Sequence, residues 1–120
     1  MKRATFLWTA IALLAGILPA ADVTGKWKGP MQTGNRELIF DLKADGGKLT
    51  GTVTGLIAKP VEIKDGRVQG DAVEFWVMSE YQGQPVKLVY KGQASASEIL
   101  FNMGTEDGSW GTEVAAKRAN

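Results

Sequence analysis

Apolar and polar residues alternate with a period of two along most of the chain after residue 22. This alternation is typical of β-strands with one face in a core and the other in solvent. Gly and Asp turn signals separate the alternating runs at intervals of about 8 to 12 residues, as expected for an all-β barrel or sandwich. We therefore predict eight strands, at residues 23–31, 36–44, 48–56, 60–69, 72–81, 85–94, 98–104 and 109–118.

The same alternation assigns a face to most of the apolar residues. In the predicted strand 98–104, apolar residues occur on both faces. The inner face is therefore either the one with Ile99, Phe101 and Met103 or the one with Leu100. In 60–69 the pair Asp65-Gly66 keeps the alternation on either side, which favours a bulge over a separate hairpin. The predicted inner residues elsewhere are Val23, Gly25, Trp27, Leu38, Phe40, Leu42, Leu49, Val53, Val73, Phe75, Val77, Val86, Leu88, Tyr90, Val114 and Ala116.

A run of hairpins leaves two exposed sheet edges unless the sheet closes on itself, and exposed edges promote aggregation. We predict that residues 22–120 form one domain, a single eight-stranded antiparallel up-and-down β-barrel. The chain has no Cys, so packing and closure must stabilise this domain without disulfides.

The first 21 residues have the pattern of a signal peptide, which would place a helix before the barrel. Lys2 and Arg3 precede an apolar stretch from 6 to 18, and Pro19-Ala20-Ala21 supplies small residues before a cleavage point near Ala21 or Asp22. The alternative is a retained membrane anchor, but the stretch is shorter than the ~20 apolar residues a spanning helix needs. We expect cleavage and a secreted or periplasmic product that is not held in a membrane.

Charge argues against two classes of partner. Lys2 and Arg3 are two of the 14 basic residues, and there are 13 acidic ones, so the chain without them has a net charge of about −1. Its signs alternate along the chain, which is unlike the basic patches that bind nucleic acid or anionic membranes.

The turns differ between the two ends of the predicted barrel. At the end holding Trp27 they are tight, at 45–47, 70–71 and 95–97. The other end carries the segments 30–35, 56–59, 82–84 and 104–109, most of them longer than a minimal hairpin turn. Because binding residues tend to sit on loops held by a rigid scaffold, we call this second end the mouth.

Aromatic, Met and hydroxyl side chains gather near the mouth, and most have inward parity. This is the usual composition of a small-molecule site, mostly apolar with a few polar groups. An eight-stranded barrel is wide enough either to be filled by side chains or to hold one small ligand, so both remain open. The candidate ligand-binding residues are Met31, Ser79, Tyr81, Met103 and Trp110.

The segment Thr24-Gly25-Lys26-Trp27 on a first strand, followed by a meander and Arg118 on the last strand, resembles the calycin superfamily of lipocalins, fatty-acid-binding proteins and avidins. The resemblance implies that Trp27 plugs the closed end and that Arg118 packs across its ring, where a guanidinium gains cation–π attraction. The alternative for Arg118 is a solvated charge. The chain also resembles, more distantly, small exported bacterial β domains.

Within that superfamily the chain resembles the avidin branch. The resemblance is carried by the same first-strand motif and by the segment Leu49-Thr50-Gly51-Thr52-Val53. Positions that hold the biotin head group in avidins fall here on Gly29, Val53 and Gly55, which carry no polar side chain. We therefore do not expect biotin binding.

Two other regions offer weaker candidates for a site. Trp76 and Met78 have outward parity beside acidic residues, so they form a candidate surface contact for a sugar or protein partner, although scattered surface apolar residues are common. Glu106 and Asp107 offer carboxylates for acid–base chemistry or a weak calcium site, but Glu-Asp-Gly-Ser is also an ordinary turn.

Three functions follow from these residues. The first is an exported carrier of a small, fairly apolar ligand, which requires a cavity. The second is a non-catalytic module that binds carbohydrate or a protein such as a protease, with a filled barrel. The third is an enzyme using Glu106, Asp107 or Tyr90, but the chain has no His and no Cys to act as base, nucleophile or metal ligand. We predict the first, with no catalysis, cofactor or metal.

Overall fold

A computed structural model describes residues 22–31 and 36–119 of the chain. The predicted signal peptide and residues 32–35 of the first predicted mouth segment lie outside these described residues. Among the described residues no helix is long and apolar enough to cross a membrane. The structure has the strands β1 (Gly25–Pro30), β2 (Glu37–Asp45), β3 (Lys48–Thr54), β4 (Val61–Glu62), β5 (Lys64–Gln69), β6 (Ala72–Tyr81), β7 (Gln84–Ala94), β8 (Glu98–Thr105) and β9 (Gly111–Ala119).

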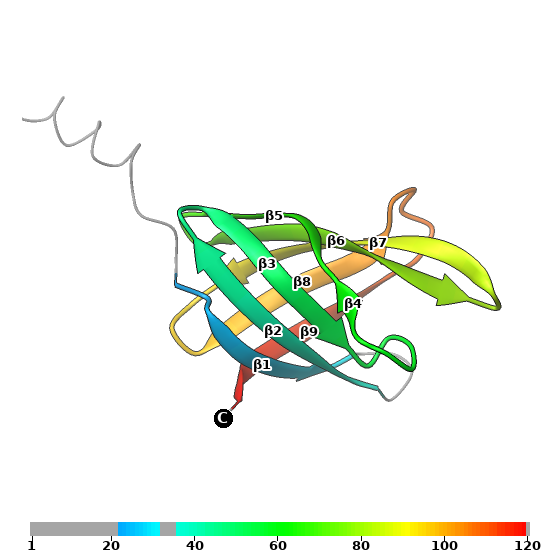
Figure 1. Ribbon diagram of the computed structural model, residues 1–120, viewed down its shortest axis with the longest axis horizontal. Coiled ribbons are helices and arrows are strands. Elements are labelled where there is room, and N and C mark those ends of the chain that lie inside the picture. The colour runs from blue at the N-terminus through cyan, green and yellow to red at the C-terminus, as the bar shows by residue number, and fades with distance from the viewer. Residues whose placement is uncertain (1–21, 32–35, 120) are drawn as a thin grey trace, which may run out of the picture.

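The strands form one antiparallel sheet that closes into a barrel (Figure 1). Consecutive strands pair with one another around most of the barrel, as in an up-and-down meander. The first and last strands meet, with Trp27 of β1 opposite Arg118 of β9, and β2 also pairs with β3. The predicted closed antiparallel barrel is therefore confirmed.

The strand count differs from the prediction at one place. The predicted strand 60–69 is divided at Ile63 into β4, which pairs with β3, and β5, which pairs with both β3 and β6. The register of β5 against β6 shifts between Lys64 and Arg67, and Asp65 in this stretch has a φ of 51°. A bulge interrupts the hydrogen-bond ladder because its extra residue has no partner opposite. The predicted bulge is confirmed, and a continuous fourth strand is wrong.

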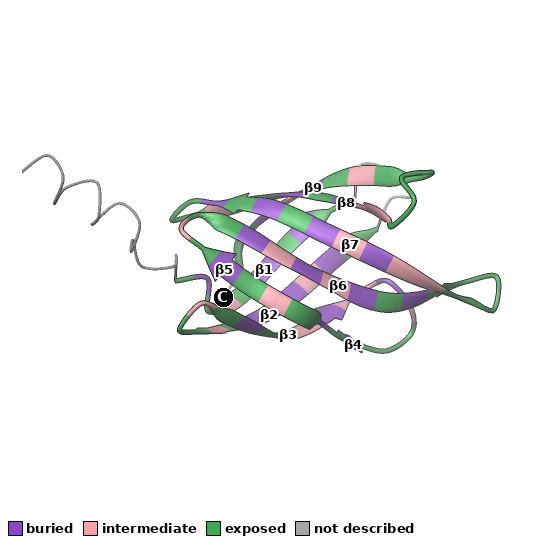
Figure 2. Cartoon of the chain, turned by 90° about the horizontal axis from the view of Figure 1, so that it is seen from above, coloured by how far each residue is buried: buried purple, intermediate pink, exposed green. Residues whose placement is uncertain are grey.

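Buried and exposed residues alternate along the strands (Figure 2). Every predicted inner residue is buried except Gly25 and Val86, which are half-buried near the two ends of the barrel. In β8 the face left open by the sequence is decided, because Ile99, Phe101 and Met103 are buried whereas Leu100 is 54% exposed.

Four aromatic rings fill the middle of the barrel. Phe75 stacks on Tyr90 with 4.7 Å between ring centroids, and Phe40 stacks on Phe101 at 4.9 Å. The remaining pairs among the four meet edge to face, an arrangement that aromatic quadrupoles favour. The interior is packed at this level, so a cavity has room only toward an end of the barrel.

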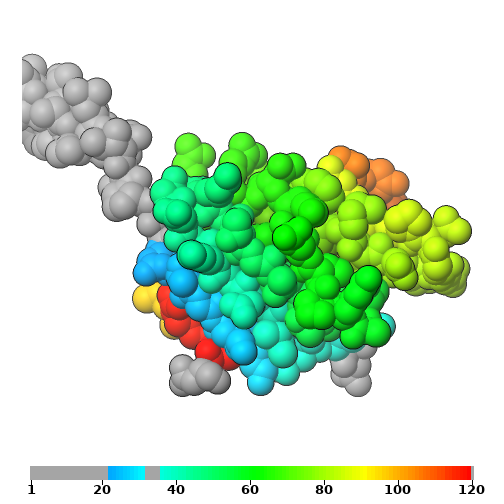
Figure 3. Space-filling view, viewed as in Figure 1, coloured from blue at the N-terminus to red at the C-terminus, as the bar shows by residue number. Residues whose placement is uncertain are grey.

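The β6–β7 hairpin extends beyond the other strands at the mouth, as Figures 1 and 3 show at the right. Its turn consists of Gln82 and Gly83, both with positive φ, at 54° and 80°. Two such residues form the turn whose twist matches that of the flanking strands. The pairing therefore continues to Tyr81 opposite Gln84, at the tip of the hairpin.

Candidate functional site

The end opposite the mouth is closed by Trp27. Its side chain is fully buried, and its indole Nε1 donates a hydrogen bond to the carbonyl oxygen of Val23 at 3.0 Å. The guanidinium carbon of Arg118 lies 4.3 Å from the centroid of the Trp27 ring. Arg118 also donates to the carbonyl oxygens of Asp22, Thr24 and Ala96 at 2.9 to 3.1 Å. Ring and guanidinium are therefore stacked together at this end of the barrel.

The mouth holds a cavity of about 510 Å³. All five candidate ligand-binding residues line it: Met31, Ser79, Tyr81, Met103 and Trp110. Its other lining residues are Arg36, Leu56, Glu80, Val86, Leu88 and Thr105. Strand pairing brings these residues together from distant parts of the sequence, since β6, β7, β8 and β9 lie side by side around the wall.

The lining residues differ in depth. Ser79, Leu88 and Met103 are buried and form the inner part of the wall. Tyr81 is 68% exposed and Trp110 is 40% exposed, so these two aromatic side chains lie at the rim. The cavity thus has an apolar interior with one buried hydroxyl, Ser79, and an aromatic rim open to solvent.

Arg36 supplies the cationic side chain in this lining, and sequence analysis did not name it. Its guanidinium donates to the carbonyl oxygens of Gly55, at 3.2 Å, and Leu56. These bonds connect the start of β2 to the segment after β3, on one side of the mouth. The available signal was parity, because Arg36 shares the inward parity of Leu38 and Phe40. The same parity predicts Val86 and Leu88 inside, and both line the cavity.

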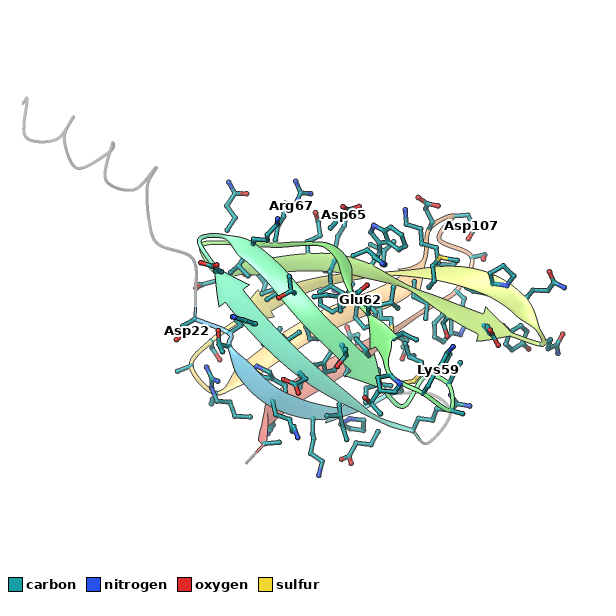
Figure 4. The ribbon with its side chains drawn as sticks, viewed as in Figure 1. Asp22, Lys59, Glu62, Asp65, Arg67 and Asp107 are labelled. Carbon is teal, nitrogen blue, oxygen red and sulfur yellow. The ribbon has the colours of Figure 1, made fainter. Side chains whose placement is uncertain are left out.

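Trp76 and Met78 lie on the outer face of β6 and do not line the cavity. The Trp76 indole Nε1 donates to Asp65 Oδ2 at 2.7 Å, and Lys87 Nζ lies 4.5 Å from the centroid of its ring. Figure 4 labels Asp65 on the outer surface. Trp76 is half-buried by these contacts, whereas Met78 is 43% exposed.

Glu106 and Asp107 lie in the loop between β8 and β9, where Figure 4 labels Asp107. The backbone N–H and hydroxyl of Ser109 and the hydroxyl of Thr105 all donate to Asp107 Oδ1. These hydrogen bonds, those of Ser109 first, hold the pKa of Asp107 below its usual value. Glu106 forms an ion pair with Lys87 at 3.1 Å. The two carboxylates border an open depression of about 380 Å³.

These carboxylates are engaged in turn and surface contacts. Within residues 22–31 and 36–119, no group of three or more His, Cys, Asp or Glu side chains is placed to hold a metal ion. Tyr90, the third residue considered for catalysis, is fully buried and does not line the cavity. Burial raises the pKa of its phenol far above the usual value.

The chain was also compared with known proteins. No protein-family model, curated protein or solved structure matches it significantly. The candidate site therefore stands on the geometry of this chain, a closed antiparallel barrel that is covered at Trp27 and hollow at the mouth.

Proposed function

We propose that this protein is a small calycin-like binding protein that takes one small, largely apolar ligand into the cavity at the mouth. The observation that carries this proposal is the cavity of about 510 Å³, lined by all five candidate ligand-binding residues. Pockets for small molecules usually have volumes of about 300–1,000 Å³ and mostly apolar walls with a few polar groups. Ser79 and Thr105 are such polar groups here.

The packed middle of the barrel limits the size of this ligand. The rings of Phe40, Phe75, Tyr90 and Phe101 occupy the level below the cavity. A ligand that enters at Tyr81 and Trp110 therefore has only the outer part of the barrel to occupy. This favours a compact molecule over a long chain that would thread the whole interior.

The alternative, a module that binds carbohydrate or protein through its outer face, has less support. Sugars stack on the exposed face of an aromatic ring. Lys87 lies over the ring of Trp76, and the indole N–H is bonded to Asp65. Met78 remains exposed beside them, but one exposed side chain is ordinary for a protein surface.

No catalytic step is part of the proposal. The cavity lining contains one carboxylate, Glu80, and its other charged side chain is Arg36. The described residues of the lining include no His, Cys or Lys to act as nucleophile or base. Binding and release of an unchanged ligand is the activity that this lining supports.

A dye titration tests the proposal. Residues 22–120 should bind an environment-sensitive apolar dye saturably, with one dye per barrel. Ser79→Phe places a ring where the cavity wall now has a hydroxymethyl group and should abolish uptake, while Trp76→Phe on the outer face serves as the matched control. Absent uptake, or uptake that Ser79→Phe leaves unchanged in a folded variant, would contradict the proposal.

Export is the second part of the proposal, supported by Lys2, Arg3 and the apolar stretch that follows them. The full chain, produced in a bacterial host, should be found outside the cytoplasm with a mass that corresponds to a start near Asp22. An uncleaved protein found in the cytoplasm would contradict export. It would not affect the binding proposal.

A further inference from the structure

The wall of the cavity is built in rows of residues that pair across β7, β8 and β9. Leu88 is opposite Thr105, and Thr105 is bonded to Trp110, so these three lining residues form an outer row. One inward position deeper on each strand is the row Tyr90, Met103 and Thr112, in which Met103 is opposite both neighbours. Met103 is the member of this inner row that lines the cavity.

The two neighbours of Met103 each carry a hydroxyl that is buried and has no hydrogen-bond partner among the described residues. These atoms are Tyr90 Oη and Thr112 Oγ1. Leaving a buried hydroxyl unpaired is costly, and most such groups in folded proteins are paired. Unpaired hydroxyls on the two residues that flank Met103 in the register therefore point to a partner that binds at this row.

The side chain of Met103 is suited to move and make room for that partner. It is 2% exposed, lines the cavity, and lies opposite Tyr90 and Thr112 on the two neighbouring strands, neither of which lines it. Its side chain is unbranched, with three rotatable bonds, so it adapts to neighbours more easily than a branched side chain does. A different rotamer of Met103 would extend the cavity by one row toward Tyr90 and Thr112.

We propose that the ligand has an uncharged carbonyl group at its leading end, and that Tyr90 Oη and Thr112 Oγ1 both donate hydrogen bonds to its oxygen once Met103 moves aside. This inference rests on the proposed function and names the class of ligand. A carbonyl oxygen has two lone pairs and can accept from both hydroxyls. It would satisfy in one contact the two hydroxyls that have no partner among the described residues.

The inner row favours an uncharged group over a carboxylate. Tyr90, Met103 and Thr112 are uncharged, and the residues opposite or stacked on Tyr90 are aromatic or apolar. The charged lining residues Arg36 and Glu80 are exposed. Burying an unpaired charge costs far more than burying a polar group that is hydrogen-bonded, so an acid group is disfavoured at this depth.

The test compares a ketone with its hydrocarbon, 2-octanone and octane, as competitors of the bound dye. The wild-type domain should prefer the ketone, and Tyr90→Phe or Thr112→Val should reduce this preference, each on the order of tenfold. Thr50→Val removes an exposed hydroxyl from β3 and is the control. A preference that survives both substitutions would overturn the inference, since the hydroxyls would then not contact the ligand.

An infrared measurement keeps the test decisive if a variant folds poorly. The carbonyl stretch of 2-octanone bound to the wild-type domain should lie below that of the ketone in octane, because two donors weaken the C=O bond. An unshifted band in the wild-type complex would overturn the inference. If both compounds displace the dye equally, the proposed function stands and this inference fails; if neither binds, the proposed function fails as well.

Discussion

The guanidinium of Arg118 lies over the indole ring of Trp27, 4.3 Å from its centroid, although the two are 91 positions apart in the sequence. The two residues are directly opposite each other where β9 pairs with β1. Arg118 also binds three backbone carbonyl oxygens, of Asp22, Thr24 and Ala96. One side chain thus joins the chain before β1, the β7–β8 turn and the last strand at the closed end.

Substitution of these two residues should destabilise the barrel unequally. Trp27→Ala removes a fully buried ring and should cost roughly 3–5 kcal/mol of unfolding free energy. Arg118→Ala removes an exposed cation and its hydrogen bonds to carbonyls and should cost less, about 1–2 kcal/mol. Urea unfolding of residues 22–120 measures both. Equal and small losses would show that the end is not held by this pair.

Gly51 should tolerate no side chain. Its φ is +145°, and a Cβ atom at this position would overlap the carbonyl oxygen of Asp41 on the neighbouring strand β2. Gly46 is the matched control, because its φ of +61° is also positive but nothing lies within 4 Å of its added Cβ. Gly46→Ala should cost about 1–2 kcal/mol from backbone strain alone, and Gly51→Ala clearly more. Equal losses in urea unfolding would contradict the close approach of the two strands.

Tyr90→Phe should make the unliganded protein more stable. The phenol oxygen of Tyr90 is buried without a hydrogen-bond partner among the described residues, and removing it relieves an unpaired polar group. We expect a gain of about 1 kcal/mol in unfolding free energy. Tyr81→Phe, at the exposed rim, should change stability little and serves as the control. A loss of stability in Tyr90→Phe would indicate that a bound water already satisfies this hydroxyl.

The loop between β8 and β9 should weaken in acid. Hydrogen bonds from Ser109 and Thr105 hold the pKa of Asp107 below the ~3.9 expected in the unfolded chain. The contribution of the carboxylate is present above the unfolded pKa and is lost as the pH falls through the folded pKa. An NMR titration of the Asp107 carboxyl carbon should therefore give a lowered pKa.

The same titration has an internal control. Ser109→Ala removes the hydroxyl donor but keeps the backbone N–H, which is the larger cause of the shift. The pKa of Asp107 should then rise only part of the way toward its usual value. A pKa of about 3.9 in the wild-type protein would contradict the loop geometry.

Much of the barrel followed from alternation alone. A strand turns successive side chains to opposite faces, so the parity of Phe40, Phe75 and Val114 was enough to place them inside. Turn residues such as Gly46 and Gly70 marked where strands end, and Asp65-Gly66 marked the bulge. These signals are local, because each depends on the backbone conformation of a few neighbouring residues.

Parity failed where both faces of a strand carry apolar residues or where a strand is interrupted. In β8 only the closed sheet decides between Phe101 and Leu100, because the packing around Phe40 and Tyr90 has room for one of them. The break at Ile63 likewise depends on strand pairing, because β4 pairs with β3 whereas β5 pairs with both β3 and β6. Arg36 was missed because its bonds to Gly55 and Leu56 cross between two segments that the pattern does not align.

The residue types near the mouth were enough to predict a candidate pocket. Its predicted residues were Met31, Ser79, Tyr81, Met103 and Trp110. Whether they surround a cavity or fill the core depends on how far four aromatic rings reach into the barrel, a question of volume that no linear pattern contains. The row of Tyr90, Met103 and Thr112 likewise exists only through register, since hydrogen-bonded pairing of β7, β8 and β9 brings together residues that lie far apart along the chain.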